Sequence, residues 1–97
     1  MYYKIKLSEY IEDDISEIAN NLFIISSSKK IARNYYDLLY AWIYSLSFQP
    51  ERYQIYIWKY RSINIKWYKI FYEVDNLKKQ VFVYRILSQK QNYRNYL

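Results

Sequence analysis

Residues 62–87, which read SINIKWYKIFYEVDNLKKQVFVYRIL, decide the fold. Apolar side chains recur there at every second position, which is the period of a β-strand, and they predict strands over residues 62–67, 68–74 and 81–87. The last of these is apolar at nearly every position, which is typical of a strand in the middle of a sheet. In the turn before it, Asn76 is a residue that can take the left-handed backbone conformation.

The residues before this stretch predict two helices. Ser8 is expected to cap the first helix, whose apolar residues recur at spacings of three and four and form one stripe. That stripe consists of Ile11, Ile15, Ile18, Leu22 and Ile25. The serines at 26–28 interrupt the pattern and offer a cap for a second helix, which has ended by Pro50. Its stripe consists of Ile31, Tyr35, Leu38, Trp42 and Leu46, widened by Leu39 and Ile43. Helices joined by so short a link pack as an antiparallel hairpin.

The remaining segments complete a predicted β-α-α-β-β-β order. Residues 2–7 alternate in polarity and predict an opening strand. Within residues 51–61, residues 54–60 could form a short strand or a loop, and a loop is expected. The expected fold is α+β, a single domain over residues 1–97 in which the helical hairpin packs on one face of an antiparallel sheet. There is no run of about 18 apolar residues for a membrane helix and no signal-peptide pattern, so a cytoplasmic location and no membrane partner are expected.

The composition excludes several kinds of chemistry. The chain contains no Cys, no His and no Gly. Disulfides, thiol or imidazole catalysis, and glycine-rich phosphate loops are therefore excluded, and catalysis would have to use Lys, Arg, Tyr, Ser and nine carboxylates. We expect no cofactor and no metal. An acidic cluster near the first helix could suggest a divalent cation site, but helix-cap electrostatics explain it better. Its members are Glu9, Glu12, Asp13, Asp14 and Glu17.

Charge is distributed unevenly along the chain. Residues 1–47 hold five basic and six acidic side chains, a net charge of −1, whereas residues 48–97 hold ten basic and three acidic side chains, a net charge of +7. A basic half with aromatic residues between the charges favours a polyanionic partner, either a nucleic acid or an acidic protein segment. The alternative is an ordinary solvated surface on a basic protein.

Four stretches, in this order and spacing, resemble the RelE/ParE superfamily of small bacterial toxins. They are residues 3–8 (YKIKLS), residues 41–50 ending in LSFQP, residues 68–75 (YKIFYEVD) and residues 84–97 (YRILSQKQNYRNYL). The resemblance covers nearly the whole chain and implies the fold predicted above. It also implies a toxin neutralised by a cognate antitoxin, and a target that is either ribosome-bound mRNA or DNA gyrase.

For the RNA-cleaving branch, the resemblance implies a set of site residues. Cleavage by a ribose 2′-OH needs cations on the developing phosphate charge and groups that move two protons. The catalytic candidates are Lys69, Arg85, Lys90 and Tyr96, and the RNA-binding candidates are Arg61, Lys66, Tyr93 and Arg94. Two departures from the pattern matter. Ser88 stands where some members have His. Lys69 stands where Arg is expected, and a lysine cannot make the bidentate contact with phosphate that an arginine makes.

Each candidate also has a structural interpretation. Lys69 could be a solvated residue on an edge strand, and Arg85 could pair with Glu73 or Asp75 across the sheet. Tyr93 and Tyr96 are more often packing residues than catalytic ones. The tyrosines of the second helix, at positions 35, 36, 40 and 44, are expected to pack in the core or the hairpin.

Three functions remain open at this point. The Lys-, Arg- and Tyr-rich late strands and tail favour ribosome-dependent mRNA cleavage and so an endoribonuclease. The absence of His and the long helical hairpin favour a gyrase inhibitor that needs no catalytic residue. An inactive nucleic-acid-binding member of the superfamily is the third. In each toxin case we expect an acidic, amphipathic antitoxin segment to cover the basic strands, the hairpin, or both.

Overall fold

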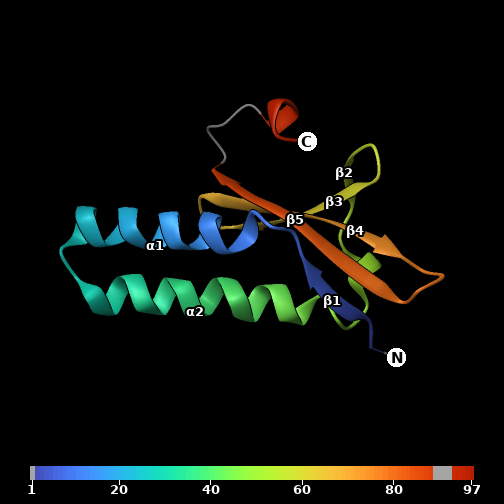
Figure 1. The fold of residues 1–97 in the computed structure, drawn as a ribbon, viewed down its shortest axis with the longest axis horizontal. Helices are drawn as coiled ribbons and strands as arrows, with labels where there is room; N and C mark the ends of the chain where they lie inside the picture. The colour runs from blue at the N-terminus through green and yellow to red at the C-terminus, as the bar shows by residue number, and fades with distance from the viewer. Residues whose placement is uncertain (1, 89–92) are drawn as a thin grey trace.

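The computed structural model describes residues 2–88 and 93–97. In chain order the elements are β1 (Lys4–Leu7), α1 (Ile11–Ser26), α2 (Lys29–Ser45), η1 (Pro50–Arg52), β2 (Ile55–Ile57), β3 (Tyr60–Ile65), β4 (Tyr68–Asp75), β5 (Gln80–Ser88) and η2 (Tyr93–Asn95). The two helices lie side by side as a hairpin that extends well beyond the sheet (Figure 1). This confirms the predicted α+β class with an N-terminal helical hairpin. None of the helices within the described ranges is long and apolar enough to cross a membrane.

The sheet is mixed, with strand order β1-β5-β4-β3-β2. The central position of β5 is confirmed, since it lies between β1 and β4. The prediction of an antiparallel sheet was wrong for β1, which runs parallel to β5, with Lys4 opposite Gln80 and Leu7 opposite Val83. Apolar alternation shows which residues share a face but does not show the direction in which neighbouring strands run.

The segment over residues 51–61, expected to be a loop, instead contains a 3-10 turn, the short strand β2 and the start of β3. The strand β2 pairs with β3 through Ile55 opposite Arg61 and Ile57 opposite Tyr60. Both Ile55 and Tyr56 are exposed, so β2 has no buried face. The alternation of apolar residues, from which the other strands were predicted, is therefore missing from β2.

The core lies between the helical hairpin and the inner face of the sheet. Its fully buried residues include Ile11 and Ile15 of α1, Leu39 and Ile43 of α2, and Ile70, Tyr72, Val81 and Val83 of the sheet. The predicted stripes are correct only near the sheet. Ile25 is 81% exposed, and Ile31 is also exposed, because both lie at the end of the hairpin that extends past the sheet. Leu39 and Ile43, which were expected only to widen the apolar stripe of α2, are fully buried and lie at its centre.

The serine predicted to start the first helix has another role. Helix α1 begins at Ile11, and Tyr10 is its N-cap residue, without a side-chain cap. The hydroxyl of Ser8 donates a hydrogen bond to the carbonyl oxygen of Tyr84, and so ties the end of β1 to β5. The second cap is confirmed, since Ser28 Oγ accepts from the Ile31 amide at 3.2 Å.

Tight turns in this glycine-free chain use residues that carry a side chain. Five of the described residues have φ between 45° and 57°: Ser27, Gln49, Trp58, Lys66 and Lys79. Between β4 and β5 the left-handed residue is Lys79 and not Asn76. Asp75 organises that turn instead, because its Oδ1 accepts hydrogen bonds from the amides of Leu77 and Lys78, each at 3.0 Å.

Candidate functional site

The face of the sheet opposite the helices, called here the outer face, carries aromatic and basic side chains. Its buried residues are Tyr60, Phe71 and Leu87, and Tyr84, Tyr93 and Leu97 pack against them. The last two belong to the C-terminal segment, which lies on the side of the sheet away from α2 (Figure 1). The outer face is therefore where the structure can bring predicted site residues together.

Lys69 on β4 lies between two tyrosine rings of this face. Its Nζ is 4.3 Å from the ring centroid of Tyr56 and 5.6 Å from that of Tyr93. The two rings also contact each other and Phe71, at centroid distances of 5.0–5.7 Å. No carboxylate in the described ranges forms an ion pair with Lys69. The edge-strand interpretation of Lys69 was wrong, because β4 lies between β5 and β3 and the side chain is half-buried.

Arg85 on β5 is held by an acidic residue of α1. Its Nε and Nη2 donate to Oδ2 and Oδ1 of Asp14, each at 2.9 Å, and the Ile86 amide donates to Oδ2 at 3.1 Å. The side chains of Arg85 and Asp14 are only 18% and 9% exposed. Hydrogen bonding to Asp14 raises the pKa of Arg85 further, so the guanidinium is permanently charged and its charge is matched.

The expected cross-strand pair of Arg85 with Glu73 or Asp75 was wrong. Glu73 instead pairs with Lys59 at 3.2 Å, and Asp75 accepts hydrogen bonds within its own turn. A shift in the β4–β5 register places Arg85 opposite Phe71 and Val83 opposite Tyr72, which leaves Tyr84 as the extra residue. This bulge breaks the alternation along β5, and Arg85 contacts α1 instead of the neighbouring strand.

The other predicted residues are scattered. Tyr96 lies 5.2 Å from the guanidinium of Arg85, measured to the ring centroid. Arg61 Nη1 donates to the Tyr53 carbonyl oxygen at 2.7 Å. Lys66 lies over the ring of Tyr35, a buried residue of α2, at 5.6 Å. Lys90 and the side chain of Arg94 lie outside the described part of the structure. The structure thus joins Lys69 with Tyr93 and Arg85 with Tyr96, and it places Arg61 and Lys66 elsewhere.

Two tyrosine hydroxyls of the outer face, those of Tyr60 and Tyr93, are harder to ionise than an exposed phenol. Burial raises the pKa of Tyr93, and burial is also the main cause of a raised pKa at Tyr60. At neutral pH both phenols therefore keep their protons, so neither supplies a phenolate base. No group of three or more Cys, Asp or Glu residues that could hold a metal ion occurs within residues 2–88 and 93–97.

Two residues of this region were missed by the sequence analysis. Asp14 was grouped with the solvated acidic cluster, although it lies three residues after Ile11 and four before Ile18, on the apolar stripe. An acid on a buried stripe requires a partner, and that signal could have identified it. Tyr56 was missed because its strand was predicted as loop.

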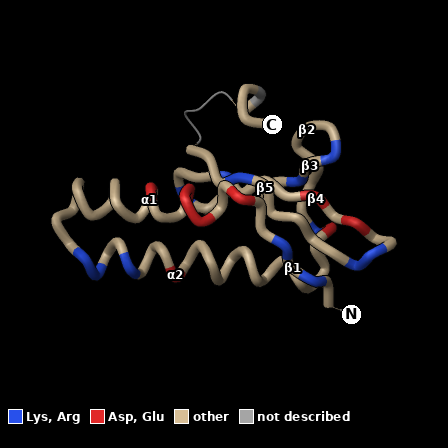
Figure 2. The backbone as a smooth tube through the Cα atoms, viewed as in Figure 1, with Lys and Arg blue, Asp and Glu red and all other residues tan. Residues whose placement is uncertain are grey.

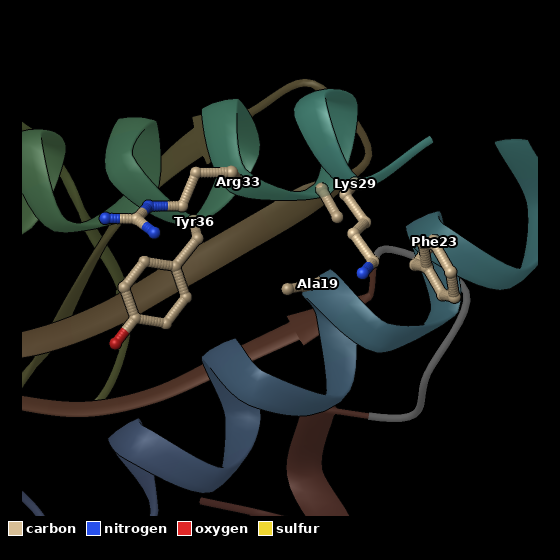
Figure 3. A pocket seen from close by; sticks show the side chains of 6 residues that line it. Ala19, Phe23, Lys29, Arg33 and Tyr36 are labelled. Atoms are coloured by element: carbon tan, nitrogen blue, oxygen red, sulfur yellow. The ribbon is translucent and has the colours of Figure 1, made fainter. Parts of the chain in front are cut away.

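A second surface lies at the far end of the hairpin. A groove of ≈ 550 Å³ there is lined by Ala19, Phe23, Lys29, Ala32, Arg33 and Tyr36. Figure 3 shows Phe23 and Ala19 coming from α1 and the two basic side chains coming from α2. The adjacent Ile24, Ile25 and Ile31 are exposed. In Figure 2 the basic residues at the start of α2 stand apart from those of the sheet. We call these nine residues the hairpin-end surface.

Comparison with solved structures identifies similar folds. A chain of the chromosomal ParDE toxin-antitoxin system from P. aeruginosa gives a TM-score of 0.77 at 11% identity, over 90% of this chain and 96% of that chain. A chain of the toxin-antitoxin complex RelBE2 from Mycobacterium tuberculosis gives a TM-score of 0.67 at 14% identity, over 92% of this chain and 100% of that chain. These likenesses show the fold. The search of curated proteins finds no match.

A family model carries the identification beyond the fold. The model, described as the ParE toxin of type II toxin-antitoxin system, parDE, matches residues 5–93. This match spans nearly the whole chain and includes the strands that suggested the RelE/ParE resemblance. The chain therefore belongs to the ParE toxin family of type II toxin-antitoxin systems.

Proposed function

We propose that this toxin acts by binding a protein target through its hairpin-end surface, and that the target is DNA gyrase. The observation that carries the proposal is the exposed apolar groove between Phe23 and Tyr36, at the end of the hairpin remote from the core. Exposed apolar residues clustered around a groove are typical of protein interfaces. The family match favours the ParE branch, for which the resemblance implies gyrase.

The state of Arg85 supports a function without catalysis. A cation that stabilises a phosphate transition state must direct its donors at the substrate. Two donors of Arg85 are already bound to Asp14, in a geometry that matches the two carboxylate oxygens. This pair is better explained as a structural link between α1 and β5 than as part of an RNA-cleaving site.

The cognate antitoxin is proposed to neutralise the toxin by covering the same surface. The groove has an apolar floor and basic residues on its rim, at Lys29 and Arg33. An acidic, amphipathic helix fits both properties, since its apolar residues would fill the groove while its carboxylates meet the rim. Both similar structures belong to toxin-antitoxin pairs, a ParDE system and a RelBE2 complex, and this supports an antitoxin partner. Binding should weaken as salt rises from low to high concentration.

A gyrase supercoiling assay tests this proposal. Phe23→Asp places a charge in the groove and should raise the toxin concentration needed for inhibition at least tenfold, because an apolar contact is replaced by a desolvated charge. The matched control is Leu77→Asp, which alters an apolar residue that is 98% exposed on the β4–β5 turn. The control should inhibit like the parent. Equal inhibition by a folded Phe23→Asp variant would contradict the proposal.

Ribosome-dependent mRNA cleavage is the second candidate, and the unpaired Lys69 on the outer face is the observation that favours it. A ribosome-programmed translation reaction would then yield discrete mRNA cuts while supercoiling is unaffected. Lys69→Gln should slow cleavage by about 10²-fold, the usual scale for losing one electrostatic or acid–base group. Lys59→Gln removes a cation of the same face that is paired with Glu73, and it serves as the control.

A further inference from the structure

A second hollow lies at the open edge of β3. The strand β2 pairs with β3 only at Tyr60 and Arg61, and beyond these residues no strand among the described segments lies alongside β3 on that side. The space left open has a volume of ≈ 480 Å³. That volume lies within the usual range for small-molecule sites, which is about 300–1,000 Å³.

The lining of this hollow combines aromatic rings with uncharged polar groups and one cation. Rings of Trp42, Tyr53 and Tyr56 line it, and Lys69 contributes the cation. Its polar side chains are Gln54, Ser62 and Asn64. Hydrogen bonds found within the described ranges do not use the side-chain amides of Gln54 and Asn64 or the hydroxyl of Ser62. These groups can therefore donate to and accept from a ligand.

The cation of the hollow differs from the cations around it. Lys59, Arg61 and Arg85 each form an ion pair with a carboxylate. Lys69 forms none within residues 2–88 and 93–97, although it is half-buried. The rings of Tyr56 and Tyr93 hold its ammonium group by cation–π contact, which positions the charge without neutralising it. Such a positive charge favours an anionic ligand group at the mouth of the hollow.

We infer that this hollow binds one nucleotide, with the base among the rings and amides and the phosphate on Lys69. Unstacked bases are recognised by aromatic stacking together with hydrogen bonds to their edges. The aromatic rings of the hollow can stack on a base. The side chains of Gln54, Asn64 and Ser62 can form hydrogen bonds with its edge. The ligand is either a free nucleoside monophosphate or one unit of a single strand. This site lies on the sheet, and it does not depend on the proposal for the hairpin-end surface.

Titration of the purified chain tests the inference. The probes are the four ribonucleoside monophosphates, inorganic phosphate and a short single-stranded oligoribonucleotide with 2′-O-methyl groups, which cannot be cleaved through the 2′-OH. Binding is followed by the amide and side-chain NMR signals of Gln54 and Asn64. We expect saturable shifts with a nucleotide and weaker binding of phosphate, because phosphate lacks the base. Preference for the oligonucleotide over every monophosphate would identify a single strand as the source, and the reverse would identify the free nucleotide.

Two variants with matched controls localise the site. Lys69→Gln should weaken nucleotide binding about tenfold or more, the scale for one charge-assisted hydrogen bond. Asn64→Ala should weaken it several-fold and alter the preference among bases. Lys59→Gln should leave the affinity within twofold, since Lys59 lies outside the lining. No saturable binding by any nucleotide would overturn the inference, as would an equal loss in Lys59→Gln, which would indicate unspecific charge attraction.

Discussion

Two basic residues on neighbouring strands show how differently one fold can use a positive charge. Around Arg85, the carboxylate of Asp14 on α1 accepts two hydrogen bonds from the guanidinium and a third from the Ile86 amide of β5. Around Lys69, two phenol rings surround an ammonium group that has no carboxylate partner within the described ranges. The first region is bound internally and contributes to stability. The second keeps its charge available, and the difference suggests where a ligand can act.

The largest expected effect comes from removing the acid of the first region. Asp14→Ala should lower the free energy of unfolding by about 3–5 kcal/mol, because Arg85 would remain as a poorly solvated charge without a partner. Urea denaturation measures this. The neighbouring Asp13 is exposed, so Asp13→Ala should change stability by no more than about 0.5 kcal/mol. Similar values for the two variants would show that the pair of Arg85 and Asp14 is not a structural link.

A smaller effect is expected when the charge of Arg85 is kept and its shape is changed. Arg85→Lys retains the positive charge but cannot make two parallel hydrogen bonds to Asp14. We expect a loss of about 2 kcal/mol in the free energy of unfolding, between the wild type and Asp14→Ala. Full stability in this variant would mean that charge alone, and not the paired geometry, holds α1 to β5.

Alkaline pH should destabilise the protein through its buried tyrosines, such as Tyr35, and not through the Arg85 pair. Burial raises the pKa of Tyr35 to about 12, from an ordinary value near 10. Between those values the unfolded chain releases the phenolic proton while the folded chain retains it, so stability present below pH 10 is lost as pH rises towards 12. The contribution of Tyr35 to this loss should be about 1 kcal/mol at pH 11, and the other buried tyrosines add to it.

Denaturation at pH 9 and pH 11 measures this loss. The guanidinium stays charged throughout the range, so Asp14→Ala, which breaks the pair without adding a group that titrates there, should show the same pH dependence as the wild type. The stability of the Tyr35→Phe variant should depend less on pH than that of the wild type. If the Asp14→Ala variant lost the pH dependence instead, the alkaline effect would belong to the ion pair.

The smallest effect on stability is expected at Lys69. Lys69→Gln removes a cation–π contact but leaves no carboxylate unpaired, so unfolding should change by no more than about 0.5 kcal/mol. The same variant should bind a nucleotide about tenfold or more weakly than the wild type. A loss of stability comparable to that of Arg85→Lys would instead place Lys69 among the structural residues, and the contrast between the two regions would disappear.

Parts of the fold were predictable because a repeating pattern marked them. The strands β3, β4 and β5 each place alternate apolar residues on the face that packs against the helices, and this alternation located them to within about two residues. The helices were predicted from the spacing of Ile11, Ile15 and Ile18. The same reasoning failed at Ile25, because a helical stripe does not show how far the helix extends beyond the sheet that buries it.

The candidate site was less predictable, since it depends on contacts between distant segments. Asp14 and Arg85 are 71 residues apart, and a bulge in β5 turns the arginine towards α1. No local pattern shows that bulge. The contact of Lys69 with Tyr56 depends on a strand that has no buried face. The resemblance to a family indicated Lys69, but the identity of its neighbours required the structure.

The absence of glycine has a consequence for how this protein responds to mutation. Replacement by glycine usually costs stability, because it adds freedom to the unfolded chain. At Trp58 and Lys66, both in the left-handed region, the native side chain is the unfavourable choice, and glycine would relieve its clash with the backbone. Selection or design could therefore strengthen this fold at its turns, one residue at a time, without altering the core, the hairpin-end surface or the residues around Arg85.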